Sequence, residues 1–350
     1  MPYEIQPYDP AMTPAYLALA RLGLGDGGAV RKTEAFWQWK HVLNPFGRSS
    51  GLHAWDPAAR QVVALRVLLR WRFVDSAGQT LCAARAVDTV THPAYRRQGI
   101  FRTLTTQAVE QLAQEGTDLI FNTPNQKSLP GYLSLGWQPV LHAPLYLRPL
   151  RPLRIARRLV GQRLLGQAAP TSEAAGAGNG SGPVAWTVFR RRFGDEIDRL
   201  TASWETARPR HGVRTARTPS YLDWRYGAHP QVEYLVCPLV ERPAERLVGY
   251  AVLRPNVRGG LQEAVLVEMA LAEPDAGLGC RLMEVVAKQV RSDYLICHFA
   301  PASFEHRMVR ANGFWRIPGR SITLVARGLS DEGLPARLQW DLTLGDLEVF

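Results

Sequence analysis

One pattern occurs twice in this 350-residue chain, and it limits the fold more than any other sequence feature. A threonine, an aromatic residue, a tryptophan followed by a basic residue, and a proline occupy matching positions in 33–45 and in 218–230, at an offset of 185. A helically spaced apolar stripe recurs in 100–112 and 278–290, at an offset of 178. A buried strand and a glycine–aromatic pair follow in both halves. Several matched patterns in one order predict an internal duplication.

The chain is interrupted near its middle by residues 167–183, where Gly, Ala, Ser and Pro replace every large apolar residue. Such a segment is typical of a flexible linker. We therefore expect a first domain over 1–150, a basic segment and linker over 151–184, a second domain over 185–328 and a tail over 329–350. The fold class is α/β (α+β): two tandem domains, each with a mixed, mostly antiparallel twisted sheet flanked by helices.

Composition fits a folded protein, because 46% of the residues are apolar. The N-terminus lacks the basic and apolar stretches of a secretory signal, and no apolar run reaches bilayer length, so a cytoplasmic protein is expected. The cysteines have neither disulfide-framework nor metal-ligand spacing, and no metal site is expected. The net charge is +11 and 38 of the 42 basic residues are arginine, which suits anion binding but does not distinguish nucleic acid, anionic lipid and a phosphorylated cofactor.

The most informative stretch of the first half is a strand, a basic loop and a helix in succession. Strands are predicted near 52–55, 62–74 and 81–90, and a helix should begin at about Gly99 and end at Gly116. Free backbone N–H groups and the positive end of the helix dipole would then point at one spot. Three arginines flank that spot, so the loop predicts an anion site.

A second motif lies about 30 residues further on. Asn125, Ser128, Tyr132, Gly136 and Trp137 have relative positions 0, 3, 7, 11 and 12. Ser128 and Tyr132 are four residues apart, so one face of a short helix would carry both hydroxyls.

Together these motifs resemble those of the GNAT superfamily of acyl-CoA-dependent N-acyltransferases. The family's phosphate loop, R/Q-x-x-G-x-G/A, is matched by Arg96, Gly99 and, imperfectly, Phe101, which replaces a small residue. The later segment, N-x-x-S-x-x-x-Y-x-x-x-G-aromatic, is matched in full from Asn125 to Trp137. The resemblance covers most of 1–150 and, more weakly, 185–328.

The resemblance implies a role for each matched position. The backbone near Val90 and Thr91 would pair with the pantetheine arm as an added strand. Tyr132 would donate a proton to the departing thiolate, and Asp88, before the loop, is the candidate base for the amine. The remaining coenzyme contacts would come from Arg96, Arg97, Gln98, Gly99, Ile100, Phe101, Arg102, Asn125 and Ser128.

The second half keeps the pattern but not these residues. Glu273 and Asp275 stand where coenzyme phosphates would lie, and Val309 stands in place of Tyr132. Two carboxylates would oppose phosphate binding, so we expect this half to have lost the site. Gly277 and Gly279 point the other way, because they match the family loop better than Phe101 does.

We therefore expect an acetyl-CoA-dependent N-acetyltransferase in which an amine attacks the thioester directly. The acceptor would be a small molecule or an amino sugar, and the positive charge is consistent with an anionic one. Two alternatives remain open: a tRNA-dependent aminoacyl transferase of the peptidoglycan-bridge type, although nucleic acid is the less favoured partner, and a non-catalytic CoA-binding module.

Two further features carry expectations. Arginines alternate with apolar residues over 148–164. A helix packed on its own domain is the favoured interpretation, and contact with a membrane surface or an acidic partner is the alternative. Trp39 and Trp224, at equivalent positions of the repeat, are predicted to lie in the core.

Overall fold

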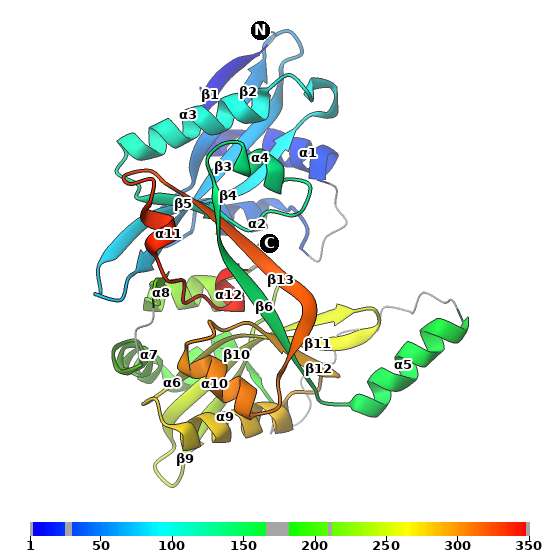
Figure 1. The fold of residues 1–350 in the computed structure, drawn as a ribbon, viewed down its shortest axis with the longest axis vertical. Helices are drawn as coiled ribbons and strands as arrows, with labels where there is room; N and C mark the ends of the chain where they lie inside the picture. The colour runs from blue at the N-terminus through cyan, green and yellow to red at the C-terminus, as the bar shows by residue number, and fades with distance from the viewer. Residues whose placement is uncertain (1–2, 25–29, 166–181, 209–211, 348–350) are drawn as a thin grey trace.

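One sheet runs through both halves of the protein (Figure 1). The computed structural model describes residues 3–24, 30–165, 182–208 and 212–347. The strands lie in the order β1-β2-β3-β4-β5-β13-β6-β12-β11-β10-β9-β7, and β8 pairs with β3. Most neighbours are antiparallel, but β4 and β5 are parallel, as are β11 and β12. The predicted mixed, mostly antiparallel architecture is confirmed.

The elements of the first half are β1 (Glu4–Pro7), η1 (Pro10–Met12), α1 (Thr13–Leu24), α2 (Glu34–His41), β2 (Ser50–Asp56), β3 (Gln61–Val74), β4 (Thr80–Thr91), η2 (Pro93–Tyr95), α3 (Ile100–Gln114), β5 (Leu119–Asn122), α4 (Leu129–Leu133) and β6 (Gln138–Pro149). The predicted strands and the predicted helix after Gly99 are confirmed. Gly116 follows that helix in the left-handed conformation, with φ +75°.

The elements that follow are α5 (Pro152–Leu165), β7 (Val184–Ala185), α6 (Trp186–Phe193), α7 (Asp195–Ala207), β8 (Arg214–Thr215), α8 (Pro219–Leu222), η3 (Asp223–Gly227), β9 (Leu235–Glu241), β10 (Arg246–Arg258), β11 (Leu261–Leu271), α9 (Ala276–Gln289), β12 (Tyr294–Cys297), α10 (Phe304–Ala311), β13 (Trp315–Gly328), α11 (Leu334–Arg337) and α12 (Leu344–Leu347). The predicted linker over 167–183 lies almost wholly outside the described residues. Within those residues, no helix is both long and apolar enough to span a bilayer, and no cluster of potential metal ligands is found.

The repeated threonine begins a helix in both halves. The Thr33 hydroxyl accepts a hydrogen bond from Phe36 N at 3.2 Å, and the Thr218 hydroxyl accepts one from Tyr221 N at 3.1 Å. A capping threonine satisfies a backbone donor that the helix itself leaves free. The same local chemistry therefore positions the repeated tryptophans on α2 and η3.

Those tryptophans form a symmetrical contact between the halves. The rings of Trp39 and Trp224 stack with centroids 4.7 Å apart and an interplanar angle of 11°. Each indole N–H donates to the other residue's main-chain carbonyl at 2.8 Å. Both side chains are buried, which confirms that they are core residues.

The two halves also exchange strands at the centre of the sheet. β13, the last strand of the chain, pairs with β5 of the first half. Reciprocally, β6, the last strand of the first half, pairs with β12 of the second. β6 and β13 cross the middle of the molecule side by side (Figure 1). The duplication and the boundaries of its two domains stay predictions. The last strand of each predicted domain is hydrogen-bonded to a strand of the other domain.

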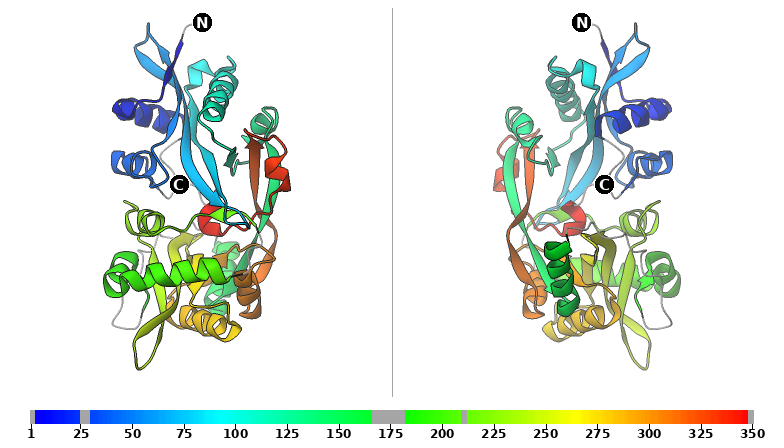
Figure 2. Two further views of the ribbon diagram at one scale, coloured as in Figure 1. Left: turned by 90° about the vertical axis from the view of Figure 1, so that its left-hand side faces the viewer. Right: turned by 90° about the vertical axis from the view of Figure 1, so that its right-hand side faces the viewer.

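Alternation along the strands of the first half builds two cores, one on each face of the sheet. Leu65, Val67 and Leu69 of β3 pack with α1 and α2, whereas Ala64 and Leu68 pack with α3. Figure 2 shows these helices on opposite sides of the sheet. The loop that leads into α3 therefore opens on the α3 face.

Candidate functional site

The sheet of the first half opens where β4 and β5 separate. The two strands pair only over Ala83–Arg85 and Leu119–Phe121. β4 continues to Thr91, and on the side of β5 its edge beyond Arg85 meets no strand of the described chain. Unpaired main-chain groups on a strand edge can accept an added strand. Val90 and Thr91, the residues predicted to pair with pantetheine, lie on this edge.

A cavity of about 500 Å³ adjoins the same edge. Its walls come from the end of β4, from residues 96–102 except Gln98, and from three residues that sequence analysis missed, Gly23, Thr89 and Tyr95. Gly23 lies on α1, and a Cβ there would come within 2.2 Å of Val90 Cγ2. Close packing of α1 on β4 thus requires glycine at position 23. The sequence around Gly23 does not indicate this contact, because Val90 is far away in the chain.

The residue before α3 provides no side-chain cap to the N-terminus of this helix. Gly99 precedes the helix with φ +76° and supplies no side-chain cap, and a Cβ built there meets nothing within 4 Å. Arg97 also has a positive φ, +64°. The first N–H groups of α3 therefore point toward the cavity without a competing acceptor, with Arg96, Arg97 and Arg102 at its wall.

The equivalent helix of the second half is closed by a carboxylate. Asp275 Oδ1 accepts a hydrogen bond from Leu278 N at 2.8 Å and so occupies the N-terminus of α9. Gly279 has a packing role, because a Cβ there would lie 2.5 Å from Met308 Sδ on α10. The retained glycine thus needs no phosphate to explain it. Val309, in the place of Tyr132, is fully buried.

Tyr132 lies under α3 and is held by an arginine that sequence analysis missed. Arg66 Nη1 donates to the Tyr132 hydroxyl at 2.8 Å and to Thr89 Oγ1 at 2.6 Å. Arg66 is 1% exposed, and its Nε and Nη2 have no hydrogen-bond partner among the described residues. An arginine within the apolar run of β3, on the face that α3 covers, is the signal that could have identified it.

Phe101, which stands where the family loop has a small residue, packs against Tyr132 and Arg66. Its ring packs edge-on against Tyr132, with centroids 5.8 Å apart, and lies 5.6 Å from the Arg66 guanidinium carbon. The Tyr132 ring is 5.2 Å from the same carbon. The buried charge is therefore stabilised by two aromatic faces.

Asn125 and Ser128 organise the start of α4 and do not line the cavity. Asn125 Oδ1 accepts hydrogen bonds from the main-chain N–H groups of Lys127 and Ser128, both at 3.0 Å. Ser128 Oγ also lies 3.2 Å from that oxygen. Their contacts with a coenzyme stay predictions.

Asp88 faces α2 from a bulge of β4, where its φ is +43°. Its carboxylate lies 3.1 Å from Lys32 Nζ, 2.6 Å from Lys40 Nζ and 3.2 Å from His41 Nε2. Burial opposes its ionisation, but the Lys40 ammonium and its other partners outweigh burial and hold the pKa of Asp88 well below its usual range. A carboxylate with so little affinity for a proton is a poor base. The assignment of Asp88 as the base stays a prediction that these contacts argue against.

Replacing Asp88 with asparagine should lower the free energy of unfolding by about 2 kcal/mol at neutral pH, because it leaves buried Lys40 without its anion. The loss is limited because burial already lowers the pKa of Lys40, which can lose its proton. The folded pKa of Asp88 lies below the unfolded value, so its ion pairs stabilise the fold above about pH 4 and are lost as the pH falls further. Urea unfolding at several pH values should show the two proteins converging in acid. A constant difference across that range would contradict this role.

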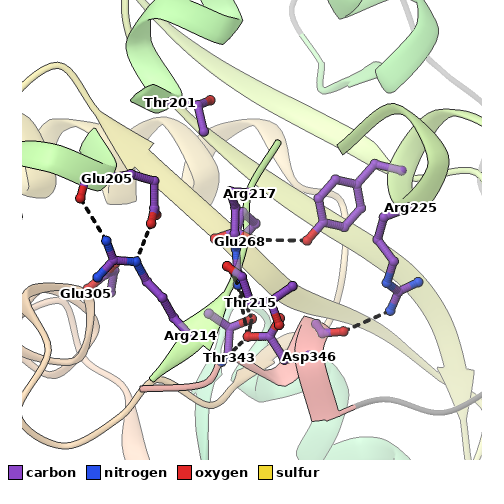
Figure 3. A network of polar contacts seen from close by, with 12 residues as sticks. Thr201, Glu205, Arg214, Thr215, Arg217, Arg225, Glu268, Glu305, Thr343 and Asp346 are labelled. Carbon is purple, nitrogen blue, oxygen red and sulfur yellow. Dashed lines mark hydrogen bonds and ion pairs between the residues drawn. The ribbon is translucent and has the colours of Figure 1, made fainter. Parts of the chain in front are cut away.

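A second buried ionic network belongs to the second half and the C-terminal segment (Figure 3). Arg217 lies 3.0 Å from Glu268 and 2.9 Å from Asp346, and burial raises the pKa of Glu268 to about 7. Arg85 of β4 donates to the main-chain carbonyls of Asp346 and Leu347 at 2.6 and 2.7 Å. The described part of the predicted tail is therefore packed against both halves, and its polar groups serve the fold.

The chain matches a known family model and known folds. Residues 38–140 match the model described as Acetyltransferase (GNAT) domain. Similar structures include a probable N-acyltransferase of Enterococcus faecalis V583 (TM-score 0.61, 14% identity, 94% of this chain and 73% of that one). They also include a GCN5-related N-acetyltransferase of Anabaena variabilis (0.59, 10%, 93% and 73%) and the N-myristoyltransferase of Saccharomyces cerevisiae with bound myristoyl-CoA (0.58, 12%, 93% and 82%). At these identities the likeness shows a common fold. Comparison with curated proteins gives no match.

Proposed function

We propose that this chain, whose residues 38–140 match the model of a GNAT acetyltransferase domain, is an N-acetyltransferase whose first half binds acetyl-CoA. The observation that carries the proposal is the uncapped N-terminus of α3, which opens into an arginine-lined cavity beside the free edge of β4. Backbone N–H groups and guanidinium groups together suit a diphosphate. The adjoining strand edge suits the amide groups of a pantetheine arm.

Tyr132 and Arg66 would act together when the thioester is cleaved. A neutral acceptor amine attacks the thioester carbonyl carbon, the C–S bond breaks, and the departing thiolate takes the Tyr132 hydroxyl proton. The nitrogen loses its surplus proton to water, and the Tyr132 phenolate regains a proton from water. Arg66 donates to the oxygen of Tyr132, which leaves the tyrosine O–H free to point away from the guanidinium. The same charge would stabilise the phenolate that remains.

The second half would contribute structure and not coenzyme binding. The Asp275 carboxylate takes the helix-terminal N–H that a phosphate would need, and Val309 offers no proton. The acceptor is proposed to be a small amine or an amino sugar. The net charge of +11 is consistent with an anionic acceptor.

Replacing Tyr132 with phenylalanine should lower the rate of acetyl transfer about a hundredfold while leaving acetyl-CoA affinity nearly unchanged, because only the proton donor is removed. Release of free CoA thiol can be followed with a panel of amines, and affinity by calorimetry. Replacing Arg66 with methionine should cause a similar loss. The double variant should be no slower than the slower single variant, because both residues act on one proton.

If the rate losses of the two single variants multiplied in the double variant, the shared role of Arg66 and Tyr132 would be contradicted. Tight acetyl-CoA binding with no thiol release by the wild type would identify a coenzyme-binding protein in place of an enzyme.

A further inference from the structure

Helix α5 projects from the body of the protein beyond the end of β6 (Figures 1 and 2). It is fixed at its start, because the main-chain N–H groups of Leu150 and Arg151 donate to the Asp293 carbonyl at 2.8 and 2.9 Å. Arg154 Nε also lies 3.3 Å from Asp293 Oδ1. The favoured expectation of a helix packed on its own domain stays a prediction: Ile155 and Arg158 are half-buried, whereas Leu153, Arg157 and Val160 are exposed.

Apolar side chains are exposed on one face of this helix. Leu153 is 76% exposed and Val160 is 55% exposed, and their spacing of seven residues places them on the same face. Ala156, between them on that face, is also exposed. Large apolar side chains gathered at the surface mark an interaction site more often than isolated ones do.

The charge of the helix has a single sign. Arg151, Arg154 and Arg157 are exposed, and the sequence contains no aspartate or glutamate between Asp118 and Glu173. The one carboxylate held against the helix start, Asp293, is fully buried. An anionic partner would therefore meet no opposing charge on α5 itself.

The surface continues beyond the helix. Trp315 is 63% exposed and pairs with Leu147, close to the point where β6 leads into α5. The β10–β11 turn reaches the same place, because Asp293 N donates to Gln262 O at 2.7 Å. Val257 and Arg258, the last residues of β10 before that turn, are exposed, and Arg258 Nε lies 3.3 Å from buried Glu263 Oε2. Tryptophan and arginine are side chains that favour the boundary between water and lipid.

We propose that α5, Trp315 and the β10–β11 turn form a docking surface for an anionic lipid bilayer. Leu153 and Val160 would enter the boundary between headgroups and acyl chains, and the arginines would contact lipid phosphates. A nucleic acid would account for the arginines but not for exposed aliphatic side chains on the same helix. The proposal is independent of the coenzyme cavity, whose lining includes no residue of α5.

The test uses the full chain and sedimentation with vesicles of phosphatidylcholine and phosphatidylglycerol, or of phosphatidylcholine alone. We expect binding to the anionic vesicles, weakened at least about tenfold without phosphatidylglycerol and weakened by added salt. Leu153→Asp should reduce binding about tenfold and Arg157→Gln about fivefold. Leu43→Asp is the matched control, because Leu43 is also an exposed leucine but lies in the first half. Circular dichroism establishes that each variant is folded.

Three results would overturn the proposal. The first is a wild type that fails to sediment with anionic vesicles, and the second is a Leu153→Asp variant that binds them as the wild type does. The third is salt-sensitive binding to a mixed tRNA sample that outcompetes the vesicles and is unchanged by Leu153→Asp, which would assign the arginines to a nucleic acid. Acetyl-CoA binding and turnover should be unaffected by either α5 variant.

Discussion

Replacing Arg96 with glutamate should weaken acetyl-CoA binding at least about a hundredfold, because the change removes a charge-assisted hydrogen bond and adds a negative charge beside a diphosphate. Arg96 lies at the wall of the cavity that receives the N-terminus of α3. Arg97 and Arg102 line the same cavity and remain in the variant. Calorimetric titration of acetyl-CoA into wild type and variant measures the effect, and its salt dependence should fall with the lost cation.

The control lies at the corresponding loop of the second half. Glu273→Ala should leave acetyl-CoA affinity nearly unchanged, since the N-terminus of α9 is closed by the Asp275 carboxylate. If Arg96→Glu kept the wild-type affinity, or Glu273→Ala raised the affinity greatly, the coenzyme would not be bound by the first half as proposed.

Replacing Trp39 with alanine should lower the free energy of unfolding by about 4 kcal/mol. The change empties a large buried volume, and it removes the indole N–H that donates to the Trp224 main-chain carbonyl. The damage should reach both halves, because the two rings form one contact between them. Urea unfolding followed by far-ultraviolet circular dichroism avoids the change in tryptophan fluorescence.

Trp39→Phe distinguishes the contribution of ring stacking from that of the indole hydrogen bond. It keeps most of the stacking area and removes the donor to the Trp224 carbonyl, so a loss of about 1–2 kcal/mol is expected. A loss below about 1 kcal/mol for Trp39→Ala would mean that the contact between the halves contributes little to stability.

The candidate site was predictable where its chemistry is local. A glycine before a helix, clustered arginines and the spacing from Asn125 to Tyr132 are features of short segments, and the structure brings the loop of 96–102 to a cavity beside β4. Asn125 and Ser128 lie outside that cavity because their polar groups start α4. Arg66 was missed because its role depends on which face of β3 meets α4, a relation between elements far apart in sequence.

Asp88 shows most clearly why a catalytic role cannot be predicted from sequence position alone. Its position before the basic loop made it a candidate base, but proton affinity depends on neighbours that the sequence does not place. Lys32, Lys40 and His41 reach it from another element, and the Lys40 ammonium stabilises the charged carboxylate against the cost of burial. The chemistry of a titratable group is set by its surroundings and not by its position in a motif.

The amino-acid sequence alone determined the elements of each half, the repeated threonine caps and the loop that opens α3, because these depend on side-chain periodicity and on hydrogen bonds within a few residues. Only the tertiary structure decided that β6 and β13 lie side by side and that each pairs with a strand of the opposite half. It also decided that α5 projects from the body of the protein. Strand partners and exposed faces are chosen by competition among distant surfaces for burial, and that competition has no signature in any one segment.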